Sequence, residues 1–91
     1  MDRPKEIELL KKALDEIPYL RTLHYRNGEF TVWRDKVLHT LESAHGKEST
    51  EYSRFVNAPG KVFIVRTEMG QQDDYNWRLD CYESVLRSLI S

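Results

Sequence analysis

The 91-residue sequence contains only one cysteine, three prolines and four glycines. A single cysteine excludes a disulfide within the chain and a zinc site built from several cysteines. Few prolines and glycines, together with 40% hydrophobic and 11% aromatic residues, indicate a globular domain rather than a disordered chain. Residues 1–12 are charged and periodic, unlike a signal peptide, and no run approaches the ~18 apolar residues of a transmembrane helix. We expect one domain over residues 1–91, cytoplasmic and without a membrane partner.

The sequence also lacks an excess of charge of either sign. It carries 14 Lys and Arg against 15 Asp and Glu, and the two signs cancel locally as well. Residues 1–26 hold six basic and five acidic groups, 27–56 hold four and five, and 57–91 hold four and five. A protein that binds a phosphate backbone usually concentrates basic side chains on one stripe or patch. Nucleic-acid binding is therefore disfavoured, although folding could still gather charges that lie apart in the sequence.

Hydrophobic periodicity predicts a first helix that starts after Asp2, with Pro4 in its first turn. Pro18 is expected to kink or break this helix, because proline lacks a backbone N–H and disfavours helical geometry in the preceding residue. A short helical continuation through Leu20 and Leu23 should follow, and the turn at 27–28 should end it. The apolar positions at three- and four-residue steps are Ile7, Leu10, Leu14 and Ile17.

The second predicted helix has the clearest pattern in the chain. Its apolar residues share one narrow arc of the helical wheel, and Gly46 follows as a stop. Ser49 is then placed to cap a shorter helix that directs Tyr52 and Phe55 inward, and residues 57–60 (NAPG) close it. The residues on the arc of the longer helix are Phe30, Trp33, Val37, Leu41 and Ala44.

The last third of the chain differs in character. Residues 61–66 (KVFIVR) form a short β-branched and aromatic run between turn residues. This run is either a strand, paired with its counterpart in another subunit, or an extended connection laid across the helices. A last helix is expected from Asp73 and Asp74, which are placed to cap it, to the end of the chain. Its apolar stripe comprises Tyr75, Leu79, Tyr82, Leu86 and Leu89.

No residue pattern in the sequence predicts catalysis, a metal site or a cofactor. His39 and His45 are six residues apart, so they do not share one helical face as an i, i+4 metal-binding pair would. We expect the histidines at the surface or at helix ends, and Cys81 to be half-buried and unreactive beside acidic neighbours. The adjacent acids at 6 and 8 and at 15 and 16 are expected to be solvated. The four glycines, at 28, 46, 60 and 70, are isolated turn residues rather than a phosphate-binding loop.

Trp77 is the exception to an otherwise simple pattern, because it falls opposite the apolar stripe of the last helix. A large aromatic side chain on an outward face needs a cover. Either residues 62–65 fold back over it, or it is a contact residue in an oligomer or partner interface, where Trp is enriched. The candidate interface comprises Val62, Phe63, Ile64, Val65, Trp77, Cys81 and Val85.

Residues 28–34 (GEFTVWR), followed by 45–49 (HGKES) and 52–55 (YSRF), resemble a known layout. This layout, written E-F-x-x-W, L, G-x-x-S and R-F, belongs to a small helical module of prokaryotic proteins that precedes other domains, including TIR-like ones implicated in defence. The final helix resembles the helix that ends this module. His45 departs from the pattern, which has an aromatic residue there. The resemblance covers most of residues 6–90 and implies an accessory, sensing or oligomerising role.

These observations predict a mainly α protein: a small bundle of three main helices and a short one, with an extended segment near residues 61–66. The predicted function is a non-enzymatic interaction or oligomerisation module, accessory to a prokaryotic defence or signalling system. Its partner is expected to be a second copy, forming a dimer, or another protein. The alternative is a helical nucleic-acid-binding or regulatory protein. An enzyme is expected only if folding places His24, His45 or Cys81 beside a carboxylate within a pocket.

Overall fold

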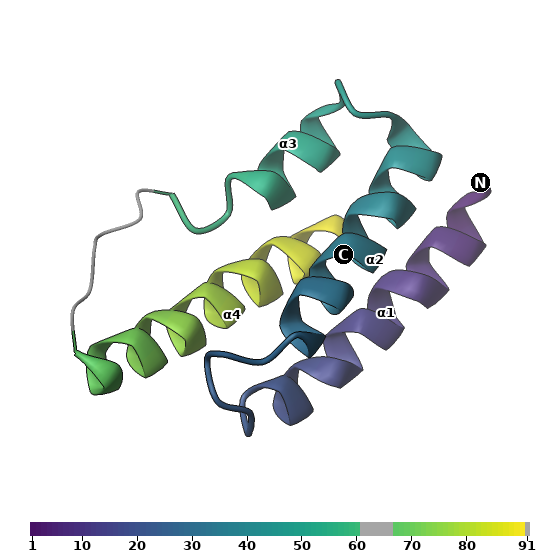
Figure 1. Cartoon of the computed structure of the whole chain (residues 1–91). Coiled ribbons are helices and arrows are strands. Elements are labelled where there is room, and N and C mark those ends of the chain that lie inside the picture. Colours follow the sequence, from purple (N-terminus) through teal and green to yellow (C-terminus); the bar gives the residue numbers. More distant parts are fainter. Residues whose placement is uncertain (61–66, 91) are drawn as a thin grey trace.

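The computed structural model describes residues 1–60 and 67–90 as a bundle of four helices (Figure 1). These helices are α1 (Arg3–Leu20), α2 (Glu29–His45), α3 (Thr50–Val56) and α4 (Glu68–Ile90). The predicted small helical bundle of three main helices and a short one is therefore confirmed. The extended segment predicted at residues 61–66 lies outside the described residues.

The helices form a ring in which each packs against its neighbours along the chain, and α4 closes the ring against α1. Figure 1 shows α1 and α2 antiparallel and side by side, with α3 turning back from the end of α2 toward α4. The backbones of α2 and α4 do not approach each other closely, so side chains fill the space between them. The ring arrangement leaves the outer seam between α1 and α2 uncovered by any other described helix.

Aromatic side chains occupy the centre of the ring. The Tyr82 ring of α4 lies 4.6 Å from the Phe55 ring of α3 and 6.0 Å from the Trp33 ring of α2, measured between centroids. Such separations are typical of favourable aromatic pairs. The predicted inward faces of α2 and α4 are thus correct, and large rings span the distance that the two backbones leave open. Aliphatic residues complete the core: Leu10, Ile17, Leu20, Val37, Leu41, Leu79, Leu86 and Leu89.

Helix α1 begins as predicted, because the Asp2 side chain accepts a hydrogen bond from the Lys5 backbone N–H. Of the kink or break predicted at Pro18, the break is wrong: α1 continues through Pro18 and ends at Leu20, short of the predicted Leu23. Proline removes one backbone hydrogen bond within the helix. Here that loss falls in the last turn, where the buried side chains of Ile17 and Leu20 still hold the backbone against the core.

The connection between α1 and α2 is tied to α4 by side chains. The Gln72 amide accepts a hydrogen bond from the Tyr25 backbone N–H (2.9 Å) and donates one to the Leu23 carbonyl (3.1 Å). The Tyr75 hydroxyl donates to the Leu20 carbonyl (2.6 Å), at the end of α1. These bonds satisfy backbone groups that the end of a helix leaves without partners. The loop therefore has a defined path, which fixes how α2 begins.

Helix α4 begins five residues earlier than the predicted caps. The Thr67 hydroxyl accepts a hydrogen bond from the Gly70 backbone N–H (3.0 Å), as an N-cap residue does. Asp73 and Asp74 consequently lie inside the helix, and Asp74 forms an ion pair with Arg78 (2.8 Å). The prediction that the two aspartates cap α4 is wrong, and Gly70 is a helical residue rather than a turn residue.

The buried tyrosines lead to a prediction about alkaline pH. Burial raises the pKa of Tyr82, against a smaller opposing effect of Arg34 and Arg78, and burial likewise raises the pKa of Tyr75. A phenol whose pKa is higher in the folded than in the unfolded chain stabilises the fold at pH values below the ordinary tyrosine pKa of 10.0. This stabilisation is lost as the pH rises through the pKa of the phenol in the folded chain. We expect the free energy of unfolding to fall between about pH 9 and about pH 11, and Tyr82→Phe to make that fall shallower. Urea unfolding at several pH values measures this, and an unchanged slope in the variant would contradict it.

Candidate functional site

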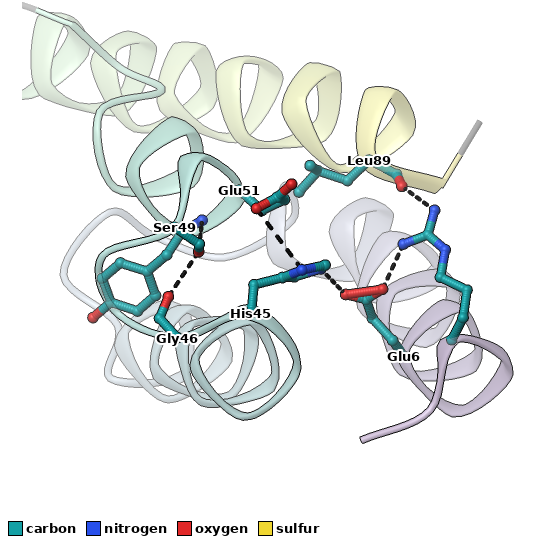
Figure 2. Close-up of polar contacts among 8 residues, drawn as sticks. Glu6, His45, Gly46, Ser49, Glu51 and Leu89 are labelled. Atoms are coloured by element: carbon teal, nitrogen blue, oxygen red, sulfur yellow. Dashed lines mark hydrogen bonds and ion pairs between the residues drawn. The ribbon is translucent and has the colours of Figure 1, made fainter.

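Four ionisable side chains converge at one end of the bundle (Figure 2). Glu6 of α1 is only 1% exposed, and its carboxylate forms ion pairs with Arg3 and with His45 Nε2. The other ring nitrogen of His45, Nδ1, lies 3.8 Å from a carboxylate oxygen of Glu51 in α3. Arg3 also donates a hydrogen bond to the Leu89 carbonyl of α4 (2.7 Å). We call Arg3, Glu6, His45, Glu51 and the Leu89 carbonyl the helix-end network, which joins all four helices.

The charges of the helix-end network suit the helix ends that they occupy. Glu6 and Glu51 lie in the first turns of α1 and α3, and His45 lies in the last turn of α2. The partial charges at helix ends favour acids at the N-terminal end and cations at the C-terminal end. Arg3 stands at the unfavourable end of its own helix but bonds a carbonyl in the last turn of α4. Local helix electrostatics and the long-range ion pairs therefore favour the same arrangement.

The helix-end network resembles part of a catalytic dyad, because a histidine lies beside a carboxylate. Catalysis would also need a nucleophile in reach and a pocket. The hydroxyl that follows in the chain, Ser49 Oγ, donates to the Gly46 carbonyl (2.7 Å) and accepts from the Tyr52 backbone N–H (3.1 Å). Figure 2 shows Ser49 turned toward Gly46. Ser49 therefore acts as the predicted cap of α3, and the arrangement can hold helix ends together.

A groove runs along the outer seam between α1 and α2. It consists of adjoining hollows of about 560, 170 and 500 Å³, and Lys36 lines all three. The indole of Trp33, itself 3% exposed, lines two of them and donates a hydrogen bond to the Ala13 carbonyl (3.0 Å). We call this feature the α1–α2 groove. The residues that line it and bear on its chemistry are Leu9, Lys12, Glu16, Tyr19, Glu29, Val32, Trp33 and Lys36.

Two large apolar side chains stand exposed at the rim of the α1–α2 groove. Tyr19 is 56% exposed and Val32 is 54% exposed, although neither is needed to cover the core. Hydrogen bonding to the Glu29 carboxylate, together with its negative charge, raises the pKa of Tyr19. Tyrosine is enriched in protein–protein interfaces, and exposed apolar patches with polar rims are typical of binding surfaces. The α1–α2 groove therefore has the composition of a protein-binding surface.

The candidate interface residues on α4 share one face of that helix. Trp77 is 43% exposed, whereas Cys81 and Val85 are half-buried, with Val85 packed against the core. Burial and the neighbouring Asp80 raise the pKa of the Cys81 thiol, in the direction that the sequence predicted. Val62–Val65, the rest of the candidate interface, lie outside the described residues. Whether this face contacts a partner therefore stays a prediction.

The three histidines have different environments. His24 precedes a turn as expected, and its Nδ1 accepts a hydrogen bond from the Arg26 backbone N–H (3.1 Å). His39 is exposed and lines one hollow of the α1–α2 groove. His45 ends α2 as expected, but its contact with buried Glu6 was not predicted. The expectation that both acids of the pair at 6 and 8 are solvated is wrong for Glu6 and correct for Glu8, whose side chain is 71% exposed.

Over residues 1–60 and 67–90, no group of three or more His, Cys, Asp or Glu side chains is placed to hold a metal ion. Of the four described helices, none is both long enough and apolar enough to span a membrane. Comparisons with protein-family models, with curated proteins and with solved structures find no match for this chain.

Proposed function

We propose that this chain is a protein-interaction module that binds its partner through the α1–α2 groove. The observation that carries the proposal is the exposure of Tyr19 and Val32 beside an open, mostly apolar groove with Trp33 at its base. Aromatic and aliphatic side chains of this kind, bordered by charges, supply most of the binding energy in protein interfaces. Trp33 is fixed by its hydrogen bond to Ala13, so the groove is formed before a partner arrives.

The charge distribution supports a protein partner over a nucleic acid. Half of the described Lys and Arg side chains have carboxylate partners in ion pairs, which lowers the number left for phosphate groups. These cations are Arg3, Lys5, Arg21, Lys47, Arg78 and Arg87. The engagement of His45 by two carboxylates and of Ser49 by its capping bonds likewise supports a non-enzymatic role. The sequence resemblance adds the expectation of an accessory module in a prokaryotic defence or signalling protein.

Site-specific photo-cross-linking tests the proposal. A photoreactive amino acid at Val32 points into the groove, and the same amino acid at exposed Glu48 serves as a control outside it. In cells of the source organism, we expect an adduct of defined mass from position 32 and none from position 48. The cross-linked protein, once purified, should bind the unmodified chain and bind the Val32→Lys variant at least about tenfold more weakly. No adduct at 32, or equal adducts at both positions, would exclude the groove as the binding surface.

A further inference from the structure

Three acids and two lysines line the α1–α2 groove: Glu16, Glu29 and Asp35, and Lys12 and Lys36. Glu29 precedes Lys36 by about two turns of α2, and Lys12 precedes Glu16 by about one turn of α1. Because α1 and α2 are antiparallel (Figure 1), Glu16 and Glu29 both lie toward the loop between the helices, and Lys12 and Lys36 both lie away from it. The end of the groove toward the loop is therefore acidic, and the other end is more basic, although Asp35 offsets part of the charge of its two lysines. We call these two ends the acidic end and the basic end.

The apolar residues of the groove are distributed along the same axis. Tyr19 lines the hollow at the acidic end, Leu9 lines the other two hollows, and Val32 lines hollows at both ends. Asp35 and His39 are the other ionisable residues that line the hollow near Leu9, and they stand on α2. Each end thus presents apolar surface as well as charge. A partner surface that fits must be apolar along its length and must carry its charges in the reverse order.

We infer that the partner is a second copy of this chain, bound groove to groove with the two grooves antiparallel. This inference rests on the proposed function of the groove. In a two-fold symmetric dimer the same patch on both subunits meets itself, and residue i of one copy contacts residue j of the other while j contacts i. A two-fold axis across the middle of the groove places the acidic end of each copy against the basic end of its partner. Tyr19 of one copy then meets the region around Leu9 of the other, and Val32, which lines hollows at both ends, lies nearer the axis.

The arrangement explains why Glu16 and Glu29 lie at one end of the groove and Lys12 and Lys36 lie toward the other. A parallel pairing would set acids against acids and lysines against lysines, and such like-charge contacts are strongly unfavourable in an interface. The antiparallel pairing forms two equivalent sets of opposite charges. It also covers Tyr19 and Val32, the exposed apolar residues of the groove.

Charge reversal at each end tests the arrangement. The variant Glu16→Lys/Glu29→Lys makes both ends basic, and the variant Lys12→Glu/Lys36→Glu makes both ends acidic. Each should self-associate at least about tenfold more weakly than the original chain, measured by analytical ultracentrifugation over a range of concentrations. An equimolar mixture should form a heterodimer, because every basic end then meets an acidic one. Native mass spectrometry with one variant isotopically labelled identifies that heterodimer.

The control Glu48→Lys/Asp73→Lys makes the same change in net charge as Glu16→Lys/Glu29→Lys, but at exposed residues outside the groove, and should dimerise like the original chain. Circular dichroism shows whether each variant keeps the helical fold. A chain that stays monomeric at all concentrations overturns the inference, as do reversed variants that dimerise normally or a mixture that stays monomeric. If position 32 still cross-links to a different protein, the groove is a binding surface and only the second copy is wrong. If it cross-links to nothing, the proposed function fails as well.

Discussion

Replacing His45 with alanine should lower the free energy of unfolding by about 3 kcal/mol. The reason is the Glu6 carboxylate, which is buried and which loses its contact with the His45 imidazole in this variant and keeps only Arg3. A buried carboxylate oxygen left without a partner costs its full desolvation penalty, which is more than the contact itself contributes. A chain of this length has a total stability of about 5–14 kcal/mol. Urea unfolding followed by circular dichroism would show the change as a clear shift of the midpoint.

Two further variants separate this cause from a general effect of losing an imidazole. His39→Ala removes an exposed histidine from the same helix and should change stability by no more than about 0.5 kcal/mol. The double variant Glu6→Met/His45→Ala should be more stable than His45→Ala alone, because it removes the buried carboxylate, one oxygen of which has lost its His45 partner in the single variant. A double variant that loses at least as much stability as the single one would show that Glu6 does not depend on His45.

The helix-end network shows what one sequence can and cannot reveal. Glu6 precedes Leu10 by four residues, and both lie on the face of α1 that carries Ile17. Helical periodicity therefore indicates that Glu6 faces the core. The expectation that Glu6 is solvated was wrong because Glu6 and Glu8, two residues apart on a helix, face different directions. His45 similarly follows buried Leu41 by four residues. The contact between Glu6 and His45 could not be predicted, because it depends on how α1 packs against α2.

The bundle itself was predictable because its faces are strongly patterned. All five residues of the α4 stripe are buried, with Tyr82 at the centre of the core. Of the α2 arc, Trp33, Val37 and Leu41 are buried, and Phe30 and Ala44 are only partly buried. Helix ends were less predictable. Pro18 has a strong preference against helix interiors, but tertiary packing of the last turn overrides it. At α4 the acids at 73 and 74 match the usual N-cap pattern, but the residue whose hydroxyl caps the helix is Thr67.

The α1–α2 groove was not predictable, because its hollows exist only where two helices diverge at their surfaces. The predicted interface lay instead on the last helix, where Trp77 is exposed as the wheel indicated. Val32 and Tyr19 gave no such signal, since single exposed apolar residues are common. Only the fold brings them together over Trp33. The sequence thus indicated an interaction module, and the packing of α1 on α2 supplies the surface that we propose for it.

The second large effect is expected at Trp33. Substitution by alanine should cost about 3–5 kcal/mol, as for other large aromatic residues in protein cores. The indole is almost fully buried, packs near the rings of Phe55 and Tyr82, and donates a hydrogen bond to the Ala13 carbonyl in α1. Its removal therefore leaves a cavity at the centre of the ring of helices and a carbonyl without that donor. Trp33→Phe keeps an aromatic ring but not the N–H, and should cost about 1–3 kcal/mol.

The chain supplies its own control, because its other tryptophan is Trp77. Trp77 is 43% exposed, so Trp77→Ala removes the same atoms from a site where water already reaches the side chain, and should cost about 1 kcal/mol or less. Urea unfolding at a protein concentration that keeps every variant monomeric compares the two without a contribution from association. Each single variant also retains one tryptophan, and the emission of the Trp77→Ala chain should lie at shorter wavelength because buried Trp33 is then the emitter. Equal losses of stability at the two positions would contradict the placement of Trp33 in the core.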